Sequence, residues 1–355
     1  MKLEILETRI FPYTYRSLAD KLEKDSIFFS AFWFNNLVTH TIHATDKILW
    51  IGIKSTSDEP LLLLPLVQSP NRLFQCNKLS GLANYYTTLF EPLQTFDEPQ
   101  QLAMAIEQIV TTICQLKWDL IDLHPLNPSS PIYPVLIDAF IKKNKHVTQY
   151  FMYGNWYFLP KGQSFADYWS TRPGQLKNTI KRKTNKLKTK QIEYRIAQHP
   201  DEVELAVRLF QQIYHASWKR DEPHPGFIPG LAKVAAEKGW LRLGLLFIDH
   251  QAAAAQLWLT ITKTAYIYKL CQNPIFDQYS PGSLLTAHLM KHVIDTDKVS
   301  KVDFLSGDDH YKKDWMSHRE ELWGLQIANP ITLIGLWQTT INKIKLFLKS
   351  NHNSL

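Results

Sequence analysis

The sequence is poor in cysteine and in long apolar runs, and each shortage excludes a class of protein. Its three cysteines, Cys76, Cys114 and Cys271, lie far apart and cannot all pair. We therefore expect a reducing compartment, with neither a disulfide framework nor a clustered zinc site. The longest aliphatic stretch, Leu61–Val67, is far too short to span a bilayer. Acidic residues interrupt the N-terminus, which argues against a secretion signal and predicts a cytoplasmic protein.

The short motifs of many enzyme families are also missing. The chain contains no Walker A sequence, no GxGxxG after a strand, no GxSxG elbow and no HExxH. Asp308, Asp309 and His310 are adjacent, but neighbours on an irregular segment rarely converge on one metal ion. We expect no metal site and no tightly bound cofactor.

What the chain does contain is an ordinary globular composition with one strongly basic segment. Hydrophobic residues make up 45% and charged residues 21%, which excludes disordered, collagen-like and coiled-coil proteins. The length of 355 residues predicts two domains. The net charge is +7, yet residues 172–195 alone hold nine basic residues and one acidic residue, so the rest is close to neutral.

One order of predicted elements occurs twice: strand, strand, strand, loop, helix, strand, helix, strand, each time after helical sequence, at 15–41 and 201–238. The first half has strands at Ile48–Lys54, Leu61–Gln68, Leu73–Leu79, Trp118–Leu123 and His146–Phe158, and helices at Gln100–Leu116 and Ile132–Lys143. The second has strands at Leu241–Phe247, Ala252–Thr260, Thr264–Cys271, Lys301–Leu305 and Leu322–Ala328, and helices from Pro281 to Ile294 and near Asp309. The repetition suggests a structural duplication.

These patterns predict an α+β fold in three parts. We expect an N-terminal domain at 1–158, a C-terminal domain at 159–330 with a basic helix at 172–195, and an amphipathic helix with a tail at 331–355. Each domain is expected to be a twisted, mixed, mostly antiparallel sheet flanked by helices.

The basic helix is expected to dock through one narrow apolar stripe. Leu176, Ile180 and Leu187 fall on one face, and the other faces carry Lys or Arg. The basic face could bind the phosphates of a donor, a tRNA, or an anionic lipid or nucleotide-linked acceptor; a solvated helix without a ligand is the alternative. The candidate binding residues are Arg172, Lys177, Lys181 and Arg182.

Segment 331–349 predicts an amphipathic helix with three lysines, Lys343, Lys345 and Lys349. Its apolar residues follow a 3-4-3-4 spacing, at Ile334, Trp337, Ile341, Ile344 and Leu348. The helix could pack on the body of the protein, join a partner helix, or bind an anionic membrane surface at the inner face of the membrane.

Two polar segments are candidates for a site. Around the end of the strand that precedes Gly307, the sequence gathers Asp303, Asp308, Tyr311 and Lys312. The second segment is the start of the helix expected from Pro281 to Ile294, where small residues leave backbone N–H groups available for an anion. The candidate residues there are Gln278, Ser280, Gly282 and Ser283. A capped helix with an ion pair, and an ordinary helix start, are the alternatives.

The motifs resemble those of a known family. They are the Ser-Trp-Lys at 217–219, the Ser-Pro-Gly-Ser-Leu-Leu at 280–285 and the Asp-Phe-Leu-Ser-Gly-Asp-Asp-His-Tyr-Lys-Lys-Asp-Trp at 303–315. With the order of elements, they resemble the CelD-type branch of the GNAT acyltransferase superfamily, which is related to the FemAB transferases. The similarity covers about 28–329, and it implies two GNAT-like domains with the active cleft built largely by the second.

The resemblance implies roles for the candidate residues. Tyr311 would be the acid that protonates a leaving thiolate and Asp308 the base or acceptor anchor, with Lys312 a weaker candidate. Backbone groups near Lys269 and Leu270 would polarise the thioester carbonyl. The phosphates of acyl-CoA, expected as co-substrate, would rest on Ser280, Gly282 and Ser283 beside Gln278. The substrate-binding candidates are Trp218, Lys219 and Asp303, with Arg172, Lys177, Lys181 and Arg182 of the basic helix.

The expected function is transfer of an acyl group from a thioester, on CoA or a carrier protein, to an amine of a cell-envelope or polysaccharide precursor. One alternative is a FemAB-like transferase that uses aminoacyl-tRNA. The other is a non-catalytic protein that binds anionic envelope precursors or nucleic acid.

Overall fold

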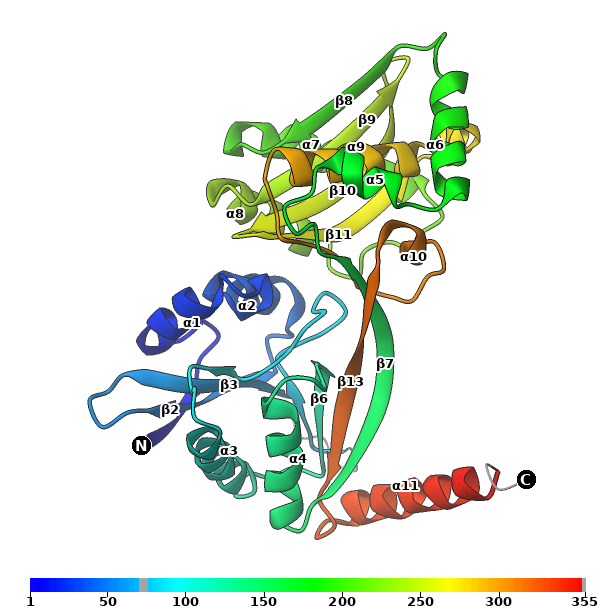
Figure 1. Ribbon diagram of the computed structural model, residues 1–355. Helices are drawn as coiled ribbons and strands as arrows, with labels where there is room; N and C mark the ends of the chain where they lie inside the picture. Colours follow the sequence, from blue (N-terminus) through cyan, green and yellow to red (C-terminus); the bar gives the residue numbers. More distant parts are fainter. Residues whose placement is uncertain (70–75, 353–355) are drawn as a thin grey trace. The chain divides into compact units, whose positions relative to one another are not determined.

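The computed structural model describes residues 1–69 and 76–352, and in the last helix it describes side chains as far as Asn342 and at Ile344 (Figure 1). Two compact units divide the chain: Met1–Tyr153 with Glu321–Leu355 (unit 1) and Gly154–Glu320 (unit 2). Outside the described residues lie positions 73–75 of the expected strand Leu73–Leu79 and the side chains of Lys343, Lys345, Leu348 and Lys349.

Unit 1 is a mixed sheet in the order β1-β2-β3-β4-β6-β13-β7, with β5 beside β3. Strands β4 and β6 run parallel, whereas the pairs from β1 to β4 and the pair β6–β13 are antiparallel. The strands are β1 (Lys2–Glu7), β2 (Lys47–Lys54), β3 (Pro60–Gln68), β4 (Lys78–Gly81), β5 (Leu93–Gln94), β6 (Leu120–Leu126), β7 (His146–Phe158) and β13 (His318–Ala328). The helices are α1 (Arg16–Leu22), α2 (Ala31–Thr41), α3 (Pro99–Ile113), α4 (Ile132–Lys142) and α11 (Leu333–His352).

Alternation along β2 explains why helices cover both faces of this sheet. Leu49, Ile51 and Ile53 pack in one core with the apolar stripes of α3 and α4. Trp50, between them, contacts Phe34 of α2 at a ring distance of 5.7 Å. Figure 1 shows α1 and α2 on one side of β2 and β3, and α3 and α4 on the other.

Unit 2 repeats this plan with the strand order β7-β12-β11-β10-β9-β8, in which β11 and β12 run parallel. Its strands are β8 (Ile192–Ala197), β9 (Leu241–Ile248), β10 (Gln251–Ile261), β11 (Thr264–Gln272) and β12 (Lys301–Ser306), with the end of β7. Its helices are α5 (Phe165–Ser170), α6 (Gly174–Lys186), α7 (Pro200–Ala216), α8 (Phe227–Glu237), α9 (Pro281–Asp295) and α10 (Lys312–Trp315).

Helix α9 lies close against the centre of the unit 2 sheet. Leu284, Leu285 and Leu289 pack in one core with Trp258 of β10. A Cβ at Gly244 of β9 would lie 2.7 Å from the Leu289 Cδ1, so a larger residue there would push the helix away. The same core includes Leu176 and Leu187, with Ile180 against it, which confirms the expected apolar stripe of the basic segment.

The expected duplication is present, and it is more complete than the sequence indicated. Apart from the two-residue strand β5 of the first half, each half runs strand, two helices, three strands, helix, strand, helix, strand: β1 to β7 and β8 to β13. We did not expect β1 or β8, the first strand of each half. The expected fold class, two tandem mixed sheets flanked by helices, is confirmed.

Two expected boundaries differ from the structure. The basic helix, expected at 172–195, is α6 and ends at Lys186, because residues 192–197 pair with β9 as strand β8. The last strand, expected in a domain ending at 330, has its second part in unit 1, because Trp323–Ala328 pair with β6.

The expected C-terminal helix is α11, and its apolar residues differ in exposure. Ile334 and Ile341 are half-buried, whereas Trp337 and Ile344 are 67% and 53% exposed. Across the described part of the chain, none of the helices combines the length and the hydropathy that a bilayer crossing requires. Cys76, Cys114 and Cys271 are free thiols.

Candidate functional site

The parallel strands β11 and β12 of unit 2 are paired over a short part of their length. Three residue pairs join Thr264–Tyr266 to Lys301–Asp303, and β11 then continues to Gln272 and β12 to Ser306. Backbone groups beyond the paired part need other partners, because an unsatisfied buried peptide group costs free energy. We term residues 267–272 of β11 and 304–306 of β12 the open edge.

A lysine from the loop after α7 binds the open edge on β11. Lys219 Nζ donates to the carbonyl oxygen of Leu270 at 2.6 Å, and burial lowers the pKa of this lysine. Beside it, Lys269 and Glu222 form an ion pair of 2.8 Å with both side chains 12% exposed. The expected backbone site at Lys269 and Leu270 is therefore bordered by two lysines. Trp218, the expected substrate contact, is 68% exposed.

A second lysine, Lys312, binds the open edge on β12. Its side chain is 5% exposed, and its Nζ donates to the carbonyl oxygens of Phe304 at 3.3 Å and Ser306 at 2.5 Å. Burial lowers the pKa of Lys312 to about 8; Lys219 acts in the same direction and Asp309, at 4.0 Å, against it. An ammonium has three N–H donors, so one remains for a ligand oxygen.

Gly307 makes room for Lys312. The φ of Gly307 is +107°, and a Cβ there would lie 3.2 Å from the Lys312 Nζ. Only glycine combines that backbone conformation with the absent side chain. The turn at Gly307 therefore positions the lysine.

Tyr311 lies at the same strand end, with its ring edge-on to Phe304 at 5.6 Å. Burial, helped by the charge of Asp309, raises the pKa of Tyr311 to about 12. A phenol with this pKa protonates a thiolate poorly, because the free thiol has a pKa near 8.5. Tyr311 is 48% exposed, however, and its expected role as the acid stays a prediction.

The environment of Asp308 does not fit the expected base. Arg319 binds both its carboxylate oxygens, with the shortest distance 2.6 Å, and Trp156 Nε1 donates to it at 2.7 Å. These hydrogen bonds, Arg319 first, hold the pKa of Asp308 at about 2. A carboxylate with this pKa accepts a proton poorly at neutral pH, so Asp308 joins the strand end to β7 and β13 within unit 2.

Two expected substrate-binding residues, Asp303 and Arg172, are buried structural groups. Asp303 is 3% exposed, pairs with Lys301 at 2.7 Å, and accepts the backbone N–H of Leu305 at 2.9 Å. Arg172 is 8% exposed, lies over the Tyr168 ring at 4.8 Å, and donates to Ser317 Oγ at 2.8 Å. Both side chains are already engaged inside unit 2, and a role for either in substrate binding stays a prediction.

The expected phosphate-binding turn before α9 already has acceptors for two of its donors. The N–H of Ser280 donates to the Asp277 carbonyl oxygen, and that of Gly282 to Gln272 Oε1, both at 3.0 Å. Asp277 also places a negative charge in the turn, where its carboxylate accepts from Gln272 at 2.6 Å. Of the three expected N–H donors, Ser283 is the one for which no such internal acceptor is seen. The turn is therefore less suited to bind a phosphate than its sequence predicts.

The first turn of α9 is fixed by a buried polar group that the sequence analysis missed. Gln256 of β10 is 1% exposed, and its Nε2 donates to the Gly282 carbonyl oxygen at 2.8 Å and to Thr286 Oγ1 at 2.9 Å. The Trp258 indole donates to the Gln256 Oε1 at 2.9 Å. This network holds the turn in place whether or not a ligand binds.

Helix α6 presents a row of exposed cations. Lys181 and Arg182 border a shallow groove together with Asn178, Asn185 and Lys186. Two other lysines are engaged: Lys177 Nζ donates to the Ser170 carbonyl oxygen at 2.8 Å, and Lys183 Nζ to that of Gln278 at 2.6 Å. Of the four expected binding residues in this segment, Lys181 and Arg182 are the two whose heads face water.

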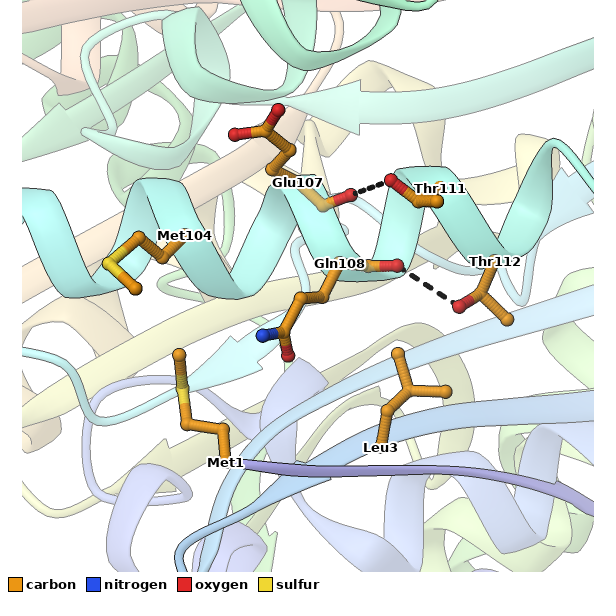
Figure 2. Close-up of a pocket in the computed structure, with 7 residues that line it drawn as sticks. All are labelled: Met1, Leu3, Met104, Glu107, Gln108, Thr111 and Thr112. Carbon is orange, nitrogen blue, oxygen red and sulfur yellow. Dashed lines mark hydrogen bonds between the residues drawn. The ribbon is translucent and has the colours of Figure 1, made fainter.

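The other pockets of the two units are lined by fewer charged or reactive side chains. In unit 1, a groove between β1 and α3 is lined by Met1, Leu3 and Met104, and the hydroxyls of Thr111 and Thr112 donate to carbonyls of their own helix (Figure 2). A cavity of about 40 Å³ beside Glu222 has room for one or two water molecules. Within the described residues, no three His, Cys, Asp or Glu side chains gather as a metal ion would require.

Unit 2 thus brings together part of the expected site. Lys219, Lys312, Tyr311 and the backbone of Leu270 gather at the open edge, with Asp309 beside them. Glu222 and Arg319 were missed, because their partners lie far away along the chain and no local pattern marks them.

Known proteins share parts of this chain's sequence and fold. Residues 174–313 match the family described as the acetyltransferase (GNAT) domain. No curated protein matches the chain in sequence. In fold it is similar to FemX, with a TM-score of 0.63, 7% identity, and 92% of this chain and 97% of that chain covered.

Two further structures share the fold. One is a tandem GNAT protein from the clavulanic acid biosynthesis pathway, with a TM-score of 0.53 and 9% identity over 93% of this chain and 99% of that chain. The other is the C-terminal domain of a protein described as a lysylphosphatidylglycerol synthetase, from Agrobacterium fabrum. It has a TM-score of 0.53 and 11% identity over 91% of this chain and 96% of that chain.

Proposed function

We propose that this chain, a member of the GNAT superfamily with the fold of its FemAB-related branch, transfers an acyl or aminoacyl group from an activated donor to an amine. The open edge of unit 2 is the proposed reaction centre. The observation that carries the proposal is Lys312, a buried lysine with two N–H donors on backbone carbonyls and the third available.

The reaction needs a donor for a developing negative charge. A neutral amine attacks the carbonyl carbon of the donor, and the carbonyl oxygen becomes an oxyanion until the leaving group departs. The third N–H of Lys312 would bind that oxyanion, and its buried position makes the interaction stronger than in water. With a pKa of about 8, Lys312 is mostly protonated at neutral pH.

The neighbouring groups would hold the substrates. Tyr311 would donate a hydrogen bond to the leaving group, and Asp309, exposed and 4.0 Å from Lys312, would hold the acceptor amine as its ammonium. The ammonium would give one proton to water before it attacks. The proton that the nitrogen loses as the N–C bond forms would pass through water to the leaving oxygen or sulfur as the bond from the carbonyl carbon to it breaks. Asp309 replaces Asp308 in this role, since Arg319 and Trp156 occupy Asp308.

Two donors fit the chemistry, and the surroundings favour one of them. Acyl-CoA would place its phosphates at the turn before α9, where two N–H groups are engaged and Asp277 repels an anion. Aminoacyl-tRNA would place its phosphates along α6, where Lys181 and Arg182 face water. We therefore propose aminoacyl-tRNA as the donor, with acyl-CoA as the second candidate.

The acceptor is proposed to be an amine of a cell-envelope or polysaccharide precursor. A fold neighbour described as a lysylphosphatidylglycerol synthetase supports an aminoacyl donor and an envelope acceptor. Both candidate donors are cytoplasmic, so the reaction is proposed to take place there.

Donor consumption tests the reaction centre. Purified protein is given radiolabelled aminoacyl-tRNA or acetyl-CoA, with an amine mixture as acceptor, and loss of the donor ester or thioester is followed. Lys312→Met should lower the rate by about 10²–10³-fold, the usual loss for one oxyanion donor. Lys78→Met, in the parallel strand pair of unit 1, is the matched control and should keep the wild-type rate. An unchanged rate in Lys312→Met would refute the proposed centre.

Salt dependence of binding tests the donor. Lys181→Gln with Arg182→Gln should weaken tRNA binding and reduce the slope of log affinity against log salt by about 1.4, at roughly 0.7 per cation. The matched control neutralises two exposed lysines of unit 1, Lys24 and Lys117, and should leave that slope unchanged. Acetyl-CoA that binds tightly while tRNA does not would reject the aminoacyl-tRNA donor in favour of the thioester.

A further inference from the structure

Helix α11 packs on unit 1 with its polar face. Gln338 and Asn342 face strand β13, where their side-chain amides donate to Gln326 Oε1 at 3.1 and 3.3 Å. Asn342 Nδ2 also donates to Thr148 Oγ1 of β7 at 2.9 Å. Asn342 and Thr339 are each 7% exposed. Hydrogen bonds between side chains therefore join this helix to the sheet.

The start of α11 also fixes which way the helix is turned. A Cβ at Gly335 would lie 2.0 Å from the Asn329 carbonyl oxygen, so no other residue permits this close approach. The Gly335 N–H donates to Thr332 Oγ1 at 3.1 Å, and Thr332 Oγ1 donates to the Asn329 carbonyl oxygen at 3.2 Å. The helix cannot rotate about its axis without breaking these contacts.

The opposite face of α11 is apolar and exposed. Leu333 is 88% exposed and Trp337 67%, and Leu336 and Ile344 are each more than half exposed. At 100° per residue, positions 333, 337 and 344 fall within a narrow sector, with 336 at its margin. We term Leu333, Leu336, Trp337 and Ile344 the outer face of α11. Ile331, just before the helix, is 83% exposed and extends this apolar surface.

The charge of this region is entirely positive. From Leu322 to the end of the chain the sequence has no Asp or Glu, and it has three lysines, Lys343, Lys345 and Lys349. Helical positions 343 and 345 adjoin position 344 of the outer face on its two sides. An apolar stripe with tryptophan, bordered by lysine positions, is the pattern of a helix that lies in the surface of a lipid bilayer.

We propose that the outer face of α11 docks on the surface of an anionic lipid bilayer, with the helix lying along that surface. The apolar side chains would enter the boundary between headgroups and acyl chains, and the lysines would contact anionic headgroups. A second copy of the chain fits less well, because paired α11 helices would bring six lysines together with no acidic residue of the segment to balance them. A nucleic acid would leave the leucine and isoleucine side chains without an apolar partner.

Flotation with vesicles tests the proposal without any activity measurement. The full chain is mixed with vesicles of phosphatidylcholine alone or of phosphatidylcholine with 30% phosphatidylglycerol, and bound protein is measured after flotation. We expect binding to the anionic vesicles that is at least tenfold stronger than to the neutral ones, and that weakens as salt is raised.

Two sets of substitutions identify the surface. Leu336→Ser, Trp337→Ser and Ile344→Ser together should lower the partition coefficient more than tenfold. Lys343→Gln and Lys345→Gln should lower it about fivefold per lysine on anionic vesicles. The matched apolar control replaces three exposed residues elsewhere, Ile10, Tyr13 and Ile275, by serine and should bind as the wild type does. All these residues are exposed or terminal, and circular dichroism checks that each variant is folded.

Three results would overturn the proposal. The first is wild-type binding by the outer-face variant. The second is loss of vesicle binding on Lys181→Gln with Arg182→Gln while the α11 variants still bind, which would assign the lipid contact to α6. The third is a wild-type dimer that sedimentation velocity shows to be a monomer in the outer-face variant, without vesicle binding in either, which would assign the face to a second copy.

Discussion

The two units contain the same parallel strand pair, and they close its end by different means. The pair β4–β6 of unit 1 ends at Asp122, and the pair β11–β12 of unit 2 ends at Asp303. Three residues further along, the Pro125 carbonyl oxygen accepts the backbone N–H of Phe90 at 2.7 Å. At the same position in unit 2, the Ser306 carbonyl oxygen accepts the Lys312 ammonium.

This difference separates a closed strand end from the proposed reaction centre. In unit 1 the loop after β4 fills the strand end with Tyr86 and Phe90, which are 1% and 2% exposed, and a Cβ at Gly81 would lie 2.7 Å from the Phe90 ring. In unit 2 the equivalent backbone is satisfied by lysine side chains, which retain a donor for a ligand. A duplicated fold can thus keep one copy for stability and leave the other open for chemistry.

Phe90→Ala tests whether the loop of unit 1 is a structural closure, and it should have the largest effect. Removing a fully buried phenylalanine should lower the free energy of unfolding by about 3–5 kcal/mol, as measured by urea denaturation. Ile275→Ala, in the equivalent loop of unit 2, is the control; Ile275 is 76% exposed, so almost no change is expected. A loss below about 1 kcal/mol in Phe90→Ala would mean that the two loops are alike.

The pH dependence of stability tests the buried lysine of unit 2. Lys312 has a pKa of about 8 in the folded chain against 10.5 for the free side chain, so the unfolded chain binds more protons between these values. The contribution of Lys312 to the free energy of unfolding, measured as the difference between the wild type and Lys312→Met, should therefore rise by about 3 kcal/mol from pH 8 to pH 10.5. Lys312→Met should lack this rise, and at pH 7 it loses the two hydrogen bonds to the carbonyl oxygens of Phe304 and Ser306.

The pH dependence of the turnover rate is a second, independent test of Lys312. Because the protonated lysine is the proposed donor, the rate should fall as pH rises through about 8. Lys78→Met should keep both the wild-type stability slope and the wild-type pH–rate profile. If Lys312→Met retained the slope between pH 8 and 10.5, the lysines of the two units would be equivalent and the comparison would fail.

Asp122→Asn and Asp303→Asn compare the shared positions directly. Both carboxylates are buried and pair with a lysine, at 2.7 Å in each case, so each substitution should cost about 1–3 kcal/mol of unfolding free energy. The KM of folded Asp303→Asn for the acceptor should be unchanged. A KM raised tenfold without loss of stability would instead make Asp303 a substrate contact.

Tyr311→Phe should have the smallest effect. With its pKa at about 12, Tyr311 is expected to act as a hydrogen-bond donor, and its loss should lower turnover by less than about tenfold. Steady-state rates with either donor measure this. A loss well above tenfold would restore Tyr311 as the acid and make unit 2 depend on two groups rather than one.

The sequence predicted those elements whose hydrophobic period is strong. Strand β7 was expected at its observed bounds, His146–Phe158, and α9 at its observed start, Pro281. Strands β1 and β8 were missed because they are short, lie at the edges of their sheets and alternate with charged residues. Edge strands bury little, so their composition resembles that of a loop.

The site was predicted by residue type better than by role. Lys312 and Lys219 were expected and do meet the open edge, but nothing local indicates that their ammonium groups bind backbone carbonyls. Asp308 accepts a hydrogen bond from Trp156, 152 residues away, so its environment depends on tertiary structure. The orientation of α11 also depends on tertiary structure, since Asn342 on its polar face donates hydrogen bonds to Thr148 and Gln326, which are distant in the sequence.

The position of β13 near the end of the sequence determines the order in which the two units can complete their folds during synthesis. Unit 2 is one continuous stretch, Gly154–Glu320, whereas unit 1 needs β13, which inserts between β6 and β7. A ribosome adds about 5–20 residues per second, so the edge of β6 stays unpaired while more than half of the chain is made. The second copy of the fold can therefore complete its sheet on the nascent chain before the first, and the N-terminal half depends on the final residues to become a finished structure.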